Sequence, residues 1–135
     1  MSMAASKVSA LPAVRDFLFE LQRKIAREND VIMDGRDIGT VVLPDAQVKI
    51  YLTASPQERA RRRHAELLQK GEKASFEEVL ADIVERDYND SHRAVAPLRQ
   101  AQDAILVDTT HLDLEKSVER IHQLIKERQS HVDRL

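Results

Sequence analysis

Charged side chains that can bind a phosphate stand beside glycines in one short stretch of the sequence. Residues 34–40 read Asp-Gly-Arg-Asp-Ile-Gly-Thr, directly after the apolar residues 31–33. The guanidinium of Arg36 suits a phosphate because its fork donates two parallel hydrogen bonds, and the carboxylate of Asp37 accepts from an amine or a hydroxyl. The flanking glycines permit a tight turn close to a ligand. The stretch indicates an anion site, although an exposed turn in which Arg36 and Asp37 pair with each other fits equally well.

A second cluster of cations follows at residues 59–63. Arg59, Arg62 and Arg63 have the spacing i, i+3 and i+4, so they can share one face of a helix. Arg61 points elsewhere, because adjacent helical positions are about 100° apart. Several guanidiniums at one cleft favour a polyanionic ligand, such as a phosphoryl group during transfer. The alternative is a solvated helix face.

A third group consists of Arg86, Asp90 and Arg93, which lie at i, i+4 and i+7 on one helical stripe. Exposed ion pairs contribute only ~0–1 kcal/mol each, so stability alone gives little reason for a ladder of salt bridges here. The functional alternative is a stripe that holds a phosphate and a base edge, with Arg15 contributing from an earlier helix. The five histidines are scattered and there is no cysteine, so we expect neither a metal-ligand cluster nor covalent catalysis.

These groups need a parallel sheet and several helices to position them. The apolar run 31–33 predicts a buried strand that ends at the sheet edge where α/β folds bind ligands. Segments 48–52 and 104–108 are rich in β-formers and predict two further strands. Apolar periodicity and capping residues predict helices from Pro12 to about residue 29, from Ser55 to about residue 70, from Ser75 to before Pro97, and from Leu114 onward; residues up to Val8 and from Gln129 are expected to be frayed or loose.

The overall composition limits the class of protein. At 135 residues with 42% hydrophobic and 4% aromatic content, we expect one domain with an aliphatic core and few surfaces for base stacking. The net charge of −2 argues against broad attraction to nucleic acid or to a membrane surface. No run approaches the ~20 apolar residues of a membrane helix, and the first residues lack the apolar core of a signal peptide. We therefore expect a cytoplasmic protein.

Five segments together resemble bacterial cytidylate kinase in their order and spacing. The resemblance extends from about residue 8 to about residue 128. The segments are Asp-Gly-Arg-Asp-Ile-Gly-Thr-Val-Val at 34–42, Val-Lys-Ile-Tyr-Leu-Thr-Ala-Ser at 48–55, Glu-Arg-Ala-Arg-Arg-Arg at 58–63, Glu-Arg-Asp at 85–87 and Arg-Ala-Val-Ala-Pro-Leu at 93–98.

This resemblance implies a P-loop nucleoside monophosphate kinase, which moves the γ-phosphoryl group of ATP onto CMP or dCMP with Mg²⁺. The arginines of the CMP site would hold the α-phosphate, and its aspartates would contact the sugar and help to recognise the nucleotide. The matching positions are Arg15, Arg36, Asp37, Arg86 and Asp90 for the CMP site, Arg62 and Arg93 for the transferring phosphates, Arg59, Arg62 and Arg63 for the ATP-side lid, and Asp34 for magnesium.

The sequence departs from the family at its glycines. The glycine-rich phosphate loop of the family has no counterpart here, because the three glycines stand at positions 35, 39 and 71. We expect an α/β fold with an incomplete kinase-like parallel sheet, in a single partial domain over 1–135 that matches the C-terminal portion of the enzyme. Its core would be 8–54 and 94–128, and residues 55–93 would form a projecting helical lid that closes over the reaction.

An incomplete domain has consequences for activity and assembly. We expect the chain alone to be inactive, and the alternative function is a non-catalytic remnant that binds an anion or a partner. An incomplete sheet would expose apolar edges, which predicts self-association, a strand-swapped oligomer or marginal stability.

Overall fold

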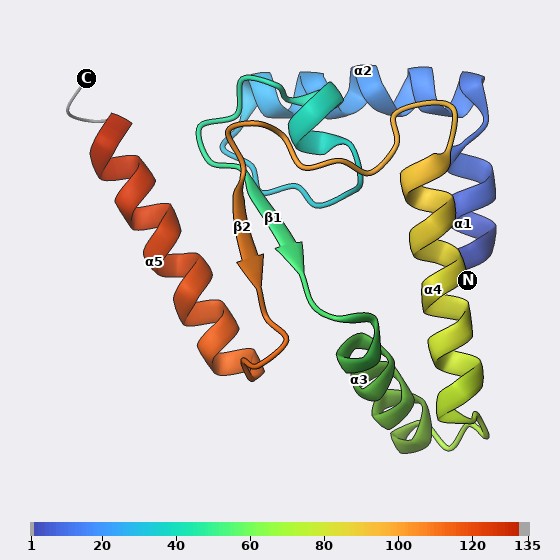
Figure 1. The fold of residues 1–135 in the computed structure, drawn as a ribbon. Helices are drawn as coiled ribbons and strands as arrows, with labels where there is room; N and C mark the ends of the chain where they lie inside the picture. The colour runs from blue at the N-terminus through green and yellow to red at the C-terminus, as the bar shows by residue number, and fades with distance from the viewer. Residues whose placement is uncertain (1, 133–135) are drawn as a thin grey trace.

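The computed structural model describes residues 2–132 and has the predicted α/β architecture, with helices arranged around a small parallel sheet (Figure 1). Its elements, in chain order, are α1 (Ser2–Ser9), α2 (Pro12–Glu28), the π-helical turn η1 (Ile38–Val42), β1 (Ile50–Thr53), α3 (Pro56–Gln69), α4 (Phe76–His92), β2 (Ile105–Asp108) and α5 (Leu114–Val132).

The sheet of the described chain consists of β1 and β2, which are parallel and pair Ile50 with Ile105 and Thr53 with Asp108. Both strands fall within one or two residues of their predicted positions. Two backbone hydrogen bonds outside the ladder extend the pairing, from the amide of Ile105 to Lys49 O (2.9 Å) and from the amide of Thr109 to Thr53 O (2.8 Å). The strands therefore end side by side, and Thr109 begins the loop at their shared carboxyl edge.

The prediction of a buried strand at residues 31–33 was wrong. These residues form neither strand nor helix, and Ile32 is 95% exposed. A strand needs a neighbour to accept its backbone hydrogen bonds, and in the described residues β1 pairs with β2 alone. The same incompleteness leaves apolar side chains on the sheet open to solvent, since Leu52 is 59% and Leu106 is 54% exposed.

Both ends of the described chain are more helical than expected. Residues 2–9 form α1 instead of a frayed start, and α5 continues to Val132 instead of ending before a loose tail at Gln129. Good helix formers lie in or directly before each segment, namely Ala4, Ala5 and Lys7 in α1 and Lys126, Glu127, Arg128 and Gln129 in α5. His131 in the last turn of α5 also suits the negative end of the helix dipole.

Helices α3 and α4 form a hairpin that extends beyond the carboxyl ends of the strands and returns toward α2 (Figure 1). Each helix begins with a serine cap, because the hydroxyl of Ser55 accepts from the amide of Glu58 and that of Ser75 from the amide of Glu78, both at 3.1 Å. Gly71, with φ of 75°, supplies the left-handed residue just past the end of α3. Ala60 of α3 is completely buried.

A helix that crosses a membrane must be both long and apolar. Within residues 2–132, none of the helices meets both conditions.

Candidate anion-binding site and the arginines of α3

Two ion pairs meet at one short segment between α2 and α4. Nη2 of Arg15 lies 2.8 Å from Oδ2 of Asp37, and Nε of Arg36 lies 3.0 Å from Oδ2 of Asp90. Arg36 and Asp37 are neighbours in the chain, so the segment they share joins both helices. The pairing of Arg36 and Asp37 with each other, which the sequence left open, does not occur.

Local backbone geometry holds this segment in place. A side chain at Gly35 would bring a Cβ to 2.9 Å from Cγ1 of Ile38, so the turn has room only for glycine. The amides of Val41 and Val42 both donate to Asp37 O, which starts η1 directly after the charged pair. Nε of Arg23 donates to Val42 O at 2.9 Å and fastens the end of η1 to α2.

A cavity of about 210 Å³ lies at this junction between α2 and η1. Charged and apolar side chains both line the cavity. This mixture suits a ligand that has an anionic part attached to a less polar part. Among the residues that line it are Arg15, Asp34, Gly35, Arg36, Asp37, Phe19, Val42 and Arg93.

The remaining residues predicted for the CMP site lie on α4 or at its end. Asp90 is buried at 7% exposure and reaches the cavity segment through Arg36. Arg86, one helical turn earlier, has a buried Nε for which the described residues provide no hydrogen-bond partner. Arg93 turns its Nε toward Ala96 O at 2.8 Å while lining the cavity. The structure therefore pairs Arg15 with Asp37 and Arg36 with Asp90, and it places Arg15, Arg36, Asp37 and Arg93 in the wall of the cavity. Arg86 and Asp90 are not among the lining residues.

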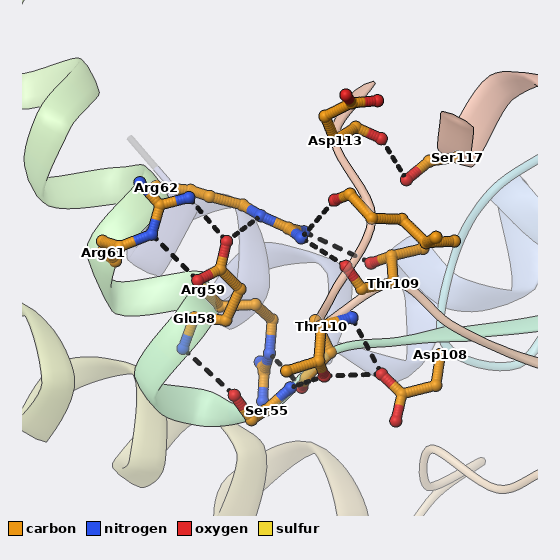
Figure 2. Close-up of polar contacts among 12 residues, drawn as sticks. Ser55, Glu58, Arg59, Arg61, Arg62, Asp108, Thr109, Thr110, Asp113 and Ser117 are labelled. Carbon is orange, nitrogen blue, oxygen red and sulfur yellow. Dashed lines mark hydrogen bonds and ion pairs between the residues drawn. The ribbon is translucent and has the colours of Figure 1, made fainter. Parts of the chain in front are cut away.

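The arginines of α3 do not converge on one cleft. Arg59 makes a bidentate pair with Asp87 of α4 (2.9 and 2.5 Å), and this carboxylate raises the pKa of the guanidinium. Arg63 lies 3.2 Å from Glu66 on the same helix. Arg62 points away from both, toward the loop after β2 (Figure 2).

Glu58 lies at the base of this arrangement and binds two guanidiniums. Its carboxylate accepts from Nε and Nη2 of Arg61 (2.9 and 2.6 Å) and from Nε of Arg62 (3.0 Å). The hydrogen bond from Arg61, followed by that from Arg62, lowers the pKa of Glu58 from 4.5 to about 2. Glu58 therefore stays ionised until the pH is strongly acidic.

Sequence reasoning missed the residues that hold Arg62. Its Nη2 donates to Thr109 O (2.6 Å) and Leu112 O (3.3 Å), and its Nη1 lies 3.2 Å from Oγ1 of Thr109. Two backbone carbonyls have no side-chain signature. The one available signal was the position of Thr109 directly after a predicted strand, at the sheet edge where ligands bind.

The residues around the cavity do not by themselves build a site for a resident metal ion. Nowhere in residues 2–132 do three His, Cys, Asp or Glu side chains come close enough to hold one. Asp34 is exposed, and the nearby carboxylate of Asp37 is engaged by Arg15. A magnesium site of this kind would need ligands from outside the chain, such as the phosphates of a nucleotide.

A larger open hollow of about 630 Å³ runs along one face of α4 and is lined by Leu80, Val84 and Tyr88 between Glu77 and Glu85. It contains no cation, and all of its lining comes from one helix. The smaller cavity is therefore the stronger of these two candidates for an anionic ligand, because its side chains come from separate elements and include cations.

Parallel strands, an adjoining helical hairpin and this pocket are consistent with part of a nucleoside monophosphate kinase-like α/β fold. The family model described as Cytidylate kinase matches residues 1–127, and the chain belongs to this family. It is 57% identical over 125 residues to the cytidylate kinase of Carboxydothermus hydrogenoformans. The aligned region covers 93% of this chain and 56% of that protein.

Two further relatives agree with this assignment. The chain is 54% identical to the cytidylate kinase of Thermosipho melanesiensis, over 92% of this chain and 57% of the relative. It is 48% identical to that of Chromobacterium violaceum, over 96% of this chain and 59% of the relative. The chain thus spans little more than half the length of the curated relatives that it matches.

Proposed function

We propose that this chain provides the CMP- or dCMP-binding part of a kinase that transfers the γ-phosphoryl group of ATP to the nucleoside monophosphate, giving CDP or dCDP. The observation that carries the proposal is the pair of ion pairs, Arg15–Asp37 and Arg36–Asp90, that meet at one cavity. Relatives named cytidylate kinase support it, although the chain spans 56% of the first of them.

The α-phosphate of CMP would be held by Arg15, Arg36 and Arg86. Each guanidinium can donate two parallel hydrogen bonds to phosphate oxygens. The unpartnered Nε of Arg86 supports this role, since a buried donor without an acceptor costs free energy until a ligand supplies one. Asp37 and Asp90 would accept from the hydroxyls of the sugar and the amine of the base.

The ATP side of the reaction would involve Arg59, Arg62 and Arg63 of the α3–α4 hairpin, residues 55–93, acting as a lid on a core formed by 8–54 and 94–128. In this proposal Arg62 and Arg93 face the transferring phosphoryl group and stabilise its developing negative charge. Asp34 would orient the divalent metal that accompanies ATP in kinase reactions.

We expect the 135 residues alone to bind nucleotide without turning it over. The three glycines of the chain are at 35, 39 and 71, and none of them opens a loop that could cradle the phosphates of ATP. A coupled assay with ATP and CMP measures this directly. Normal turnover by the isolated chain would contradict the expectation.

Calorimetric titration with CMP, and separately with inorganic phosphate, tests the binding proposal. We expect CMP to bind more tightly, because the carboxylates add contacts to the nucleoside. Arg36→Ala should weaken CMP binding by about tenfold, since a hydrogen bond to a charged group contributes roughly 1.5–3 kcal/mol. Arg99→Ala removes an exposed arginine outside the cavity and serves as the matched control.

The alternative is a non-catalytic module that binds any anion. Equal affinities for CMP and inorganic phosphate, both reduced by Arg36→Ala, would favour that function over the kinase. Absence of binding for both ligands would overturn the two functions together.

A further inference from the structure

The guanidinium of Arg62 bridges two parts of the fold that otherwise have little contact. It lies on α3, and its Nη1 and Nη2 reach Thr109 and Leu112 in the loop between β2 and α5 (Figure 2). Thr109 itself is 5% exposed and donates its hydroxyl to Thr53 O at the end of β1. Arg62 is therefore bound to the carboxyl edge of both strands through one buried threonine.

The loop partners of Arg62 differ in charge from the partner of Arg59 on α4. Arg59 is held by both oxygens of the Asp87 carboxylate, which belongs to the same hairpin. The loop offers Arg62 two carbonyls and a hydroxyl, all neutral. The bonds to Asp87 add the Coulomb attraction of an ion pair, which a neutral carbonyl or hydroxyl cannot supply. A polyanion can therefore replace the loop at Arg62 more readily than it can displace Asp87 from Arg59.

Release from the loop would not leave Arg62 disordered. Its Nε donates to Oε1 of Glu58, one turn earlier on the same helix, at 3.0 Å. This bond uses the Nε donor, which the loop does not contact. The exchangeable donors would stay directed outward from α3 while their acceptors changed.

The attachment of the hairpin to the rest of the molecule depends on few such links. Within the described residues, Arg62 is the side chain of α3 that hydrogen-bonds the β2–α5 loop, and Ser55 adds a bond from its amide to Oγ1 of Thr110 at 2.9 Å. On the other helix, Arg36–Asp90 connects α4 to the cavity segment. Loss of the Arg62 contacts would leave α3 attached mainly through the short connection at Ala54 and Ser55.

We propose that Arg62 is a latch, which fixes the orientation of the α3–α4 hairpin by binding the loop 109–112 and is released when a polyanion takes over its Nη1 and Nη2 donors. This inference goes beyond the proposed function, because it concerns what holds the hairpin before any substrate binds. In the same arrangement Arg59 keeps its bonds to Asp87 when Arg62 leaves the loop, so α3 and α4 stay connected to each other.

Distance measurements between two spin labels test the latch. The chain has no cysteine, so Gln69→Cys at the end of α3 and Glu119→Cys on α5 place labels at two exposed positions without competing thiols. We expect a narrow distance distribution in the unliganded chain. Inorganic tripolyphosphate should shift and broaden it, whereas sodium chloride at the same ionic strength should not.

Variants in the labelled background separate the latch from general charge effects. Arg62→Ala should give the broad, shifted distribution without any anion and should abolish the response to tripolyphosphate. Arg61→Ala removes a guanidinium that binds the same Glu58 but does not contact the loop, and it should behave as the unsubstituted chain. Circular dichroism would establish that each variant keeps its helices.

Three results would overturn the inference: an Arg62→Ala distribution identical to the original, an equal effect of Arg61→Ala, or an unchanged distribution at saturating tripolyphosphate. None of them depends on CMP binding or on turnover. Failure of the latch and failure of the proposed kinase function are therefore distinguishable.

Discussion

Asp37 and Asp90 each engage an arginine that a phosphate would otherwise bind. Arg15 is largely buried in its pair, whereas the side chain of Arg36 is 40% exposed. An entering phosphate therefore competes with a carboxylate for each guanidinium, and the more accessible Arg36 is the easier one to capture. The two aspartates keep the arginines oriented, and they also limit how tightly a simple anion can bind.

Asp90→Asn should separate these two roles. Freed from its carboxylate, Arg36 should bind inorganic phosphate roughly fivefold more tightly, since partly exposed pairs contribute up to about 1 kcal/mol. CMP should gain less or lose affinity, because the variant also lacks the carboxylate proposed to contact the nucleoside. Calorimetric titration gives both constants. Asp82→Asn on the exposed part of α4 is the control, and an unchanged ratio of the two affinities would contradict the proposed role of Asp90.

Glu58 gives the molecule a defined acid sensitivity. Its folded-state pKa is about 2, below the ordinary value of 4.5, so ionised Glu58 favours the folded state. This contribution is complete above about pH 4.5 and disappears as the pH falls toward 2. The free energies of unfolding of the original chain and of Glu58→Gln should therefore differ by a constant amount at neutral pH and converge between pH 4.5 and 2.

Urea titrations at several pH values would measure this convergence. Glu119→Gln, which removes an exposed carboxylate on α5, should leave the pH profile unchanged. A difference between the original chain and Glu58→Gln that stays constant down to pH 2 would show that the arginines do not stabilise the carboxylate.

Among the secondary-structure elements, locally encoded features were predictable and non-local ones were not. The serine caps of α3 and α4 and the β-rich segments of β1 and β2 carry their signals within a few residues. The run 31–33 has the composition of a strand, but a strand also needs a partner, and composition contains no information about one. The helical position of Arg62 is predictable, but its backbone-carbonyl partners in a distant loop have no side-chain signal beyond the position of Thr109 after a strand.

Ala60 of α3 has no exposed surface. Ala60→Leu should lower the free energy of unfolding by about 1–3 kcal/mol, because a larger side chain at a completely buried position overpacks its surroundings. Ala65→Leu, at an exposed position of the same helix, should have little effect. Chemical denaturation monitored by circular dichroism compares the free energies of unfolding of the two variants. An equal effect of both substitutions would mean that the larger side chain at Ala60 is accommodated without loss of stability.

For the whole molecule, the important feature is apolar surface around an open sheet. Ile32, Leu52 and Leu106 are all more than half exposed, and β1 has one unpaired edge in the described structure. Exposed edges of this kind invite pairing with another chain. Self-association therefore stays a prediction of the fold, and a compact, stable monomer in light scattering would count against it.

Ile32→Lys should reduce this association with little effect on the monomer, because Ile32 at 95% exposure has almost no packing to lose. Multi-angle light scattering over a range of concentrations would give the mass. Leu114→Lys changes an equally apolar, 81% exposed residue at the start of α5 and is the matched control. If both variants lowered the measured mass equally, the association would reflect non-specific hydrophobic contact and would not depend on the surface at Ile32.

The two helices of the hairpin complete their first turns in different ways. Both have a serine cap, but at α3 the amide of Ser55 itself is bound by Thr110, a residue 55 positions later in the chain. The hydrogen bonds at the start of α3 are therefore complete only after β2 has paired with β1. Those at the start of α4 come from residues of that helix and its cap. One bond at the start of α3 thus depends on a loop that follows it by more than fifty residues, whereas the cap of α4 depends on its neighbours alone.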